Sequence, residues 1–138
     1  MEPQAIDLDA LRDMIPFAAA LGIELVEARP ELVRGRLGWA TERTTTADVM
    51  HGGAIMALAD TCGGVCAFLN LPEGARGTAT IESKTNFLRA VRSGYITATT
   101  RALHLGRIVA VLETEIARHD GELAAKVTQT QIYHYGGT

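Results

Sequence analysis

The segment His51–Leu69 reads HGGAIMALADTCGGVCAFL, and it predicts one long helix. From Ala54 onward its residues are almost all small and apolar, which is typical of a helix that is buried on all sides. Residues 70–74 (NLPEG) predict its end, because proline cannot continue a helix and glycine accommodates the exit turn. Asp60 is the only formally charged side chain in the helix.

Runs with strand character flank this helix on both sides. Before it, residues 23–28 and 32–40 predict a hairpin, and after it four runs cover residues 77–88, 94–105, 108–118 and 122–135. Residues 8–21 have helical spacing around Pro16, which should kink or split that helix. This order predicts an α+β fold, with a long central helix wrapped by a curved antiparallel sheet of about six strands, plus a short N-terminal helix.

Length and composition indicate one globular domain over residues 1–138, with 47% hydrophobic residues and a net charge of -3. The acidic balance argues against nucleic acid as a partner. No stretch approaches the roughly 20 apolar residues of a membrane span. The first ten residues show no targeting pattern, so we expect a cytoplasmic protein without a membrane partner. Cys62 and Cys66 are predicted to be buried free thiols, and neither a metal nor a redox cofactor is expected.

Two features of this helix suggest a role in catalysis. His51-Gly52-Gly53 leads into the helix, whose free backbone N–H groups attract negative charge, including an oxyanion at an attacked carbonyl. The same residues alone also fit a tight turn and a structural histidine. Asp60 is costly to bury in an apolar helix unless it is paired, solvated in a cleft or used. It therefore suggests a general base or a nucleophile, and a structural hydrogen bond is the alternative.

Residues 51–60 (HGGAIMALAD) resemble the HGG-x6-D signature of hot-dog acyl-CoA thioesterases of the phenylacetate-degradation (PaaI) type. Residues 85–89 (TNFLR) and 105–107 (LGR) are also similar to that group. The resemblance implies hydrolysis of an acyl-CoA thioester to free acid and coenzyme A, with no cofactor beyond the coenzyme A of the substrate. It implies that Asp60 activates water or attacks the carbonyl, and that the N–H of Gly52 holds the oxyanion. His51 would belong to the same catalytic site.

The resemblance also directs attention to residues around this signature. A threonine on the strand opposite the aspartate is expected, with Thr80 as first choice and Thr78 as second. The family usually has an asparagine several residues before the histidine, but residues 44–48 (TTTAD) contain none. A threonine of this stretch or Asp48 must then substitute, or activity is low. The predicted substrate-binding residues are Gly53, Thr45, Asp48, Arg89, Arg92 and Arg107, the three arginines being candidates for the phosphates of coenzyme A or else solvated surface charges.

The spacing of Gly52 and Asp60 predicts a shared site. Eight residues of helix span about 12 Å, so the two cannot touch one carbonyl within a single chain. Two antiparallel copies of the helix would bring Gly52 of one subunit near Asp60 of the other. The resemblance implies such a homodimer, assembled further into a tetramer. The alternative functions are a non-catalytic acyl-CoA sensor or carrier, a hot-dog hydratase or dehydratase using His51, and a structural oligomer.

Overall fold

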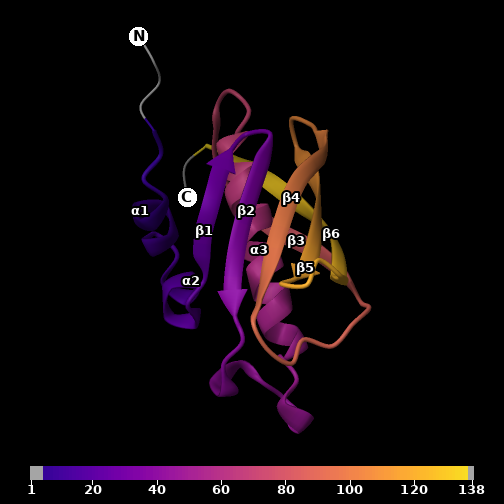
Figure 1. Cartoon of the computed structure of the whole chain (residues 1–138). Helices are drawn as coiled ribbons and strands as arrows, with labels where there is room; N and C mark the ends of the chain where they lie inside the picture. The colour runs from indigo at the N-terminus through magenta and orange to yellow at the C-terminus, as the bar shows by residue number, and fades with distance from the viewer. Residues whose placement is uncertain (1–4, 137–138) are drawn as a thin grey trace.

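One long helix lies against a single curved sheet in the computed structural model, which describes residues 5–136 (Figure 1). The helix is α3 (Gly52–Leu69). The six antiparallel strands follow the spatial order β1-β2-β4-β5-β6-β3. Their bounds are β1 (Glu24–Arg29), β2 (Leu32–Gly38), β3 (Ala75–Phe87), β4 (Tyr95–Leu105), β5 (Val109–Arg118) and β6 (Leu123–Tyr135). The predicted α+β hot-dog fold is confirmed. The predicted domain, residues 1–138, extends at both ends beyond the described residues and stays a prediction.

Pro16 splits the predicted N-terminal helix in two, as its ring requires. The first part is α1 (Leu8–Asp13), where Asp7 caps the helix by accepting a hydrogen bond from the N–H of Ala10 at 3.1 Å. The second is α2 (Pro16–Leu21), which has the proline in its first turn. It ends at Gly22, whose φ of 91° lies in the left-handed region. Two short 3-10 turns, η1 (Thr41–Arg43) and η2 (Thr46–Asp48), precede α3.

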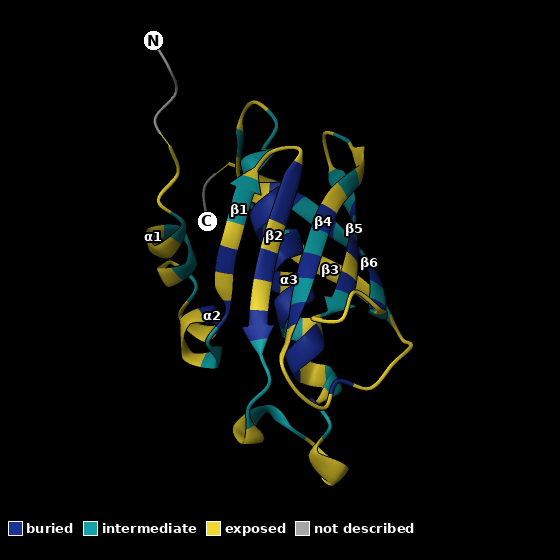
Figure 2. Ribbon diagram, viewed as in Figure 1, coloured by how far each residue is buried: buried dark blue, intermediate teal, exposed yellow. Residues whose placement is uncertain are grey.

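The hydrophobic core fills the space between α3 and the sheet (Figure 2). On the helix, Leu58 and Cys62 are completely buried, and on the sheet so are Leu37, Ile96 and Leu112. Each such aliphatic side chain stabilises the fold by roughly 1.5–3 kcal/mol relative to an exposed position. By length and composition α3 would also be able to cross a membrane. Core helices of folded proteins often have the same length and composition, so this property alone does not indicate a membrane span.

The opposite face of α3 is open in the single chain, so the prediction of a helix buried on all sides is wrong at this level. Gly53, Met56, Asp60 and Phe68 recur at helical spacing on this face and are exposed. One sheet can cover only one side of a helix. The sequence did not distinguish the two sides because the open side is also mostly small and apolar. Asp60 therefore meets solvent rather than a sealed interior.

A β-bulge in the edge strand β3 controls which side chains face the helix. Thr80 pairs with Gln131 of β6, whereas Glu82 pairs with Thr130, so the register shifts by one residue between them. Opposite residues of an antiparallel pair share a face of the sheet. Thr80 thus points with Gln131 toward α3. Glu82 points away and accepts a hydrogen bond from Thr130 at 3.0 Å. The bulge keeps a second carboxylate away from Asp60.

Candidate active site

The first turn of α3 carries the backbone donors that the sequence predicts. His51 is the N-cap residue, and its Nδ1 accepts a hydrogen bond from the N–H of Gly53 at 2.7 Å. Its carbonyl oxygen accepts from the N–H of Ala54 at 2.9 Å. Within residues 5–136 no acceptor takes the N–H of Gly52. The structure thus uses His51 as a helix cap and leaves Gly52, rather than Gly53, with a donor free for an anion.

Asp60 lies two helical turns further along, on the open face of α3. Its Oδ1 accepts hydrogen bonds from Oγ1 of Thr80 at 2.6 Å and from Nε2 of Gln129 at 3.1 Å. Both donors are neutral. In the described part of the chain, no cation forms an ion pair with Asp60, and no donor bonds Oδ2. The carboxylate is therefore fixed through one oxygen and open through the other.

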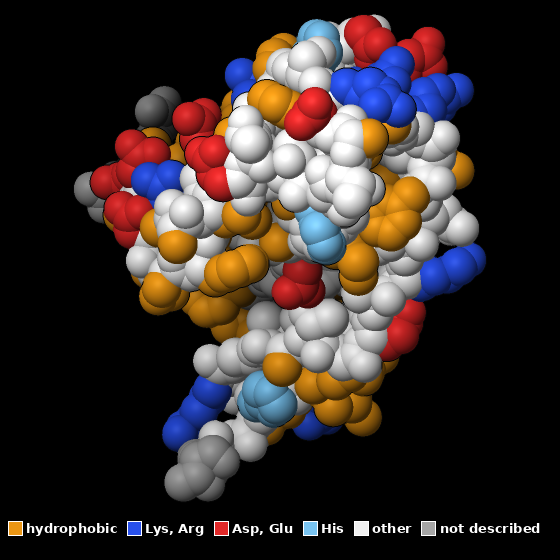
Figure 3. Space-filling model, turned by 90° about the horizontal axis from the view of Figure 1, so that it is seen from below, with side chains coloured by type: hydrophobic (Ala, Val, Ile, Leu, Met, Phe, Trp, Pro, Cys, Tyr) orange, Lys and Arg blue, Asp and Glu red, His pale blue; other side chains and the backbone are white. Residues whose placement is uncertain are grey.

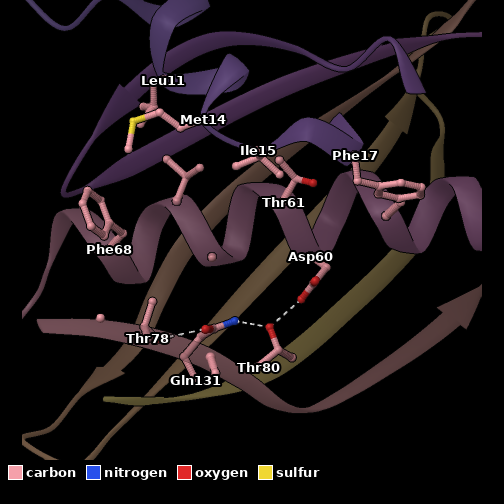
Figure 4. Close-up of a pocket in the computed structure, with 15 residues that line it drawn as sticks. Leu11, Met14, Ile15, Phe17, Asp60, Thr61, Phe68, Thr78, Thr80 and Gln131 are labelled. Atoms are coloured by element: carbon pink, nitrogen blue, oxygen red, sulfur yellow. Dashed lines mark hydrogen bonds between the residues drawn. The ribbon is translucent and has the colours of Figure 1, made fainter. Parts of the chain in front are cut away.

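A second layer of side chains supports Thr80 (Figure 4). Gln131 donates from Nε2 to Oγ1 of Thr80 and accepts at Oε1 from the hydroxyl of Thr78 at 2.9 Å. Thr80, the first choice from the sequence, thus lies opposite the aspartate as expected. Thr78, the second choice, reaches Asp60 only through Gln131 and Thr80.

Sequence reasoning missed Gln129 and Gln131. Both lie on β6, where residues 127–133 read VTQTQIY. Strand alternation places the two glutamines on the inner face with Val127 and Tyr133, and the intervening threonines on the outer face. Two inward amides in an otherwise apolar series were the available signal, because buried polar side chains need partners.

A cavity of about 540 Å³ opens beside Asp60. In Figure 4, α1 and α2 flank α3 on one side, and Thr78, Thr80 and Gln131 lie on the other. Its apolar lining comes from Leu11, Met14, Ile15, Phe17, Ala57, Val65 and Phe68. A groove of this kind accommodates an apolar group next to a few polar atoms. We call it the Asp60 groove.

A separate cavity of about 420 Å³ lies at the start of α3. Gly52 lines it together with Thr45, Phe87 and Arg89. We call it the Gly52 pocket. Gly52 and Asp60 line different cavities of the same chain, as their spacing predicts.

Seen from below the view of Figure 1, hydrophobic side chains gather around a small acidic patch, and Lys and Arg lie toward the margins (Figure 3).

The three candidate arginines do not form one cluster in the chain. Arg89 donates to the carbonyl oxygen of Leu123 at 2.7 Å and lies 3.5 Å from the carboxylate of Glu122, beside the turn between β5 and β6. Arg92 donates to the carbonyl oxygen of Ala47 at 3.4 Å. Arg107 lies in the turn between β4 and β5, at the other end of the sheet. Its guanidinium is 5.8 Å from the ring centre of Tyr135.

The loop before α3 contains the predicted residues Thr45 and Asp48. Thr45 lines the Gly52 pocket, and its N–H donates to the carbonyl oxygen of Val49 at 2.8 Å. Asp48 does not line that pocket, and its carbonyl oxygen accepts from the indole of Trp39 at 2.9 Å. Ala47 and Asp48 have φ values of 62° and 58°, which non-glycine residues rarely adopt. Such strain often accompanies functional loops.

The two cysteines are buried and unbridged, as predicted. Burial raises the pKa of the Cys62 thiol to about 12 and that of Cys66 to about 11. Among the described residues, no group of three or more His, Cys, Asp or Glu side chains gathers to hold a metal ion.

Comparison with known proteins shows a family and a fold for this chain. The profile of the Thioesterase superfamily matches residues 47–125, which include α3 and strands β3, β4 and β5. PA1618 of Pseudomonas aeruginosa is 35% identical over 74 residues, which are 54% of this chain and 51% of that protein. The 1,4-dihydroxy-2-naphthoyl-CoA hydrolase of Escherichia coli is 33% identical over 75 residues, 54% of each chain. The matched segment thus spans about half the length of these relatives.

Solved structures are similar over nearly the whole chain. A mutant of thioesterase PA1618 superposes with a TM-score of 0.89 and 26% identity, covering 96% of this chain and 97% of that one. The PaaI protein from the phenylacetic acid degradation operon of E. coli has a TM-score of 0.81 and 23% identity, covering 94% and 91%. The second likeness concerns the fold alone.

Proposed function

This chain belongs to the Thioesterase superfamily, and from that premise we propose that it hydrolyses acyl-coenzyme A thioesters to free acid and coenzyme A. The observation that carries the proposal is the carboxylate of Asp60. It is exposed beside an apolar groove, anchored through Oδ1 by two neutral donors and open at Oδ2. A carboxylate in this setting can take a proton from water or attack a carbonyl carbon.

Charge that develops on the thioester oxygen would be stabilised by the N–H of Gly52 at the start of α3. In the general-base route, the oxygen of a water molecule bonds to the carbonyl carbon and its proton passes to Asp60. Collapse of the tetrahedral intermediate breaks the carbon–sulfur bond, and a proton returns to the leaving thiolate. In the nucleophilic route a carboxylate oxygen of Asp60 bonds to the carbonyl carbon, the carbon–sulfur bond breaks, and coenzyme A leaves as a thiolate that takes up a proton. Water then cleaves the anhydride, which releases the free acid and restores the carboxylate of Asp60. Both routes need the same carboxylate and the same oxyanion donor.

The proposal requires two subunits. Gly52 and Asp60 line separate cavities of one chain, so we propose a twofold homodimer, with further assembly into a tetramer, that pairs each Asp60 with the Gly52 of its partner. The acyl group would lie in the Asp60 groove. Coenzyme A would approach along the Gly52 pocket, where Arg89 and Thr45 line the wall and would bind its polar atoms.

A non-catalytic acyl-CoA sensor or carrier is the second candidate. One observation favours it: the loop of residues 44–48 lacks the asparagine expected from the resemblance and offers threonines and Asp48 instead. Such a protein would bind acyl-CoA in the same cavities without releasing the thiol.

The test measures release of free coenzyme A thiol from a panel of short, medium-length and aromatic acyl-CoAs. Asp60→Asn keeps the size of the side chain and should lower kcat by roughly 10²–10⁴-fold, the range typical of a positioned acid or base. Asp120→Asn is the matched control. Asp120 pairs with Arg118 at 2.7 Å in the turn between β5 and β6, and this hydrogen-bonded cation lowers its pKa to about 2.

We expect the Asp120 variant to turn over like the wild type. Equal rates for wild type and Asp60→Asn would contradict the assignment. Binding of acyl-CoA by the wild type without thiol release would support the sensor instead, and a changed acyl chain with an intact thioester would indicate a hydratase.

A further inference from the structure

Two buried amides of β6 lie directly behind the proposed catalytic carboxylate. Gln129 and Gln131 are 0% and 1% exposed, although the neighbouring inward side chains on the strand, Val127 and Tyr133, belong to the hydrophobic core. Removing an amide from water is costly unless both its donor and its acceptor find partners. Two such residues on one inner face therefore need an explanation beyond packing.

The side chain of Gln129 is oriented so that its amide nitrogen contacts Asp60 while its amide oxygen has no partner within residues 5–136. Its Nε2 donates to Oδ1 of Asp60 at 3.1 Å. Its Oε1 is buried and accepts no hydrogen bond within the described residues. Buried polar atoms without a partner are uncommon in folded proteins; among the described residues, the other side-chain atom of this kind is Oγ1 of Thr85. The oxygen without a partner therefore belongs to the same amide whose nitrogen donates to Asp60.

Gly63 in α3 makes room for this amide. It follows Asp60 by one helical turn, and a Cβ at this position would overlap the amide group of Gln129. Glycine destabilises a helix interior relative to alanine. Glycine at position 63 is thus a second unfavourable feature beside the unpartnered oxygen of Gln129. Its structural effect is to let the Gln129 amide approach Asp60.

Gln131 acts one step further back. Its Nε2 donates to the hydroxyl oxygen of Thr80, and its Oε1 accepts from Thr78. With its oxygen engaged by Gln131, the hydroxyl of Thr80 directs its own hydrogen to Oδ1 of Asp60. Direct and indirect support therefore converge on the same carboxylate oxygen.

We propose that Gln129 and Gln131 are positioning residues of the hydrolytic site, and that they make Oδ2 of Asp60 the reacting oxygen. Two donors on Oδ1 fix the rotation of the carboxylate. Oδ2 is left facing the groove, where water or the thioester can reach it. This inference rests on the proposed function and adds to it the residues that orient the carboxylate.

The experiment compares kcat and KM for thiol release by Gln129→Met, Gln131→Met and the wild-type protein. Loss of the donor to a charged group should lower kcat of Gln129→Met roughly tenfold, with little change in KM. A loss confined to kcat in a folded variant is what a positioning role predicts, because a change in stability alone would not separate kcat from KM. Gln131→Met, which acts through Thr80, should lower kcat by less.

Gln129→Glu keeps the shape of the side chain and brings a second carboxylate against Asp60. We expect it to lower kcat at least as much as Gln129→Met does, because an ionised carboxylate offers no hydrogen-bond donor to Oδ1 of Asp60. This variant also guards against a folding defect in the apolar one. Thr114→Val is the matched control: Thr114 is buried and hydrogen-bonded to Thr100 at 2.7 Å, and it makes no hydrogen bond to the Asp60 network. It should lower Tm and leave kcat unchanged.

A wild-type kcat in folded Gln129 variants would overturn the proposal. So would a loss of kcat of the same size in Thr114→Val, because the effect would then follow stability alone. Absence of thiol release by the wild type would remove the proposed function itself, and this distinguishes the two failures.

Discussion

The Gly52 pocket and the Asp60 groove hold complementary halves of one chemistry. The pocket contains the free N–H of a helix start, and among the described residues no carboxylate lines it. The groove contains a carboxylate held by neutral donors, far from that helix start. Thioester hydrolysis by the proposed route needs a base and an oxyanion donor at the same carbonyl. Under the proposed function, the difference between the two cavities means that the single chain carries two half-sites, and the proposed functional unit is the dimer.

After Asp60→Asn, the largest effect is expected from removing the donor of the Gly52 pocket. Gly52→Pro deletes the N–H at a helix position where proline is tolerated, and His51 already has the extended backbone that proline requires of its predecessor. The loss of one oxyanion donor should lower kcat by roughly 10²–10³-fold. The measurement is steady-state thiol release, with circular dichroism to confirm folding.

Gly52→Ala is the control for this change. It introduces the same Cβ, 3.0 Å from the ring of Phe87, but keeps the N–H. The alanine variant should retain most of its activity, because the exposed ring edge of Phe87 can shift. Equal losses in both variants would mean that crowding, and not the donor, is responsible.

The second effect tests whether the two halves come from different subunits. Mixing inactive Asp60→Asn and Gly52→Pro chains and allowing random exchange should restore about 25% of wild-type activity, since each intact half is drawn with probability one half. The same treatment of each variant alone should restore none. A mixture that stays inactive after verified exchange would place both halves in one chain.

The smallest effect concerns the acyl group. Phe17 is 64% exposed and lines the Asp60 groove, whereas Phe87 is 52% exposed and lines the Gly52 pocket. Phe17→Ala should raise KM about three- to tenfold for long acyl chains, because apolar contact is lost in binding. Phe87→Ala should affect all chain lengths alike. A chain-length dependence in the Phe87 variant instead would reverse the assignment of the two cavities.

The helix and the strands could be predicted because each has a local period. The run from Ala54 to Leu69 and the glycine-punctuated strands lie within a few residues of the observed elements, and Pro16 splits the first helix as expected. The prediction for α3 gave the helix correctly but not its exposed face. Its open face has the same small and apolar character as its buried face, so composition alone could not separate them.

The surroundings of Asp60 depended on tertiary structure. Thr80 was found through the resemblance, but Gln129 meets Asp60 from 69 residues away, across a strand register set by a bulge. No local pattern encodes that register. Arg107 was grouped with Arg89 because both lie near turns, yet the strand order sends those turns to opposite ends of the sheet. The roles of all these residues, the oligomer and the cytoplasmic location stay predictions.

The buried cysteines have a practical consequence for the chemistry proposed. With thiol pKa values raised to about 12 and about 11, both sulfurs stay protonated and sheltered at neutral pH, so neither competes as an acceptor for the acyl group. A disulfide reagent added to the native enzyme should therefore react with liberated coenzyme A alone. The colour it develops would count turnovers directly, without a background from the catalyst's own sulfur.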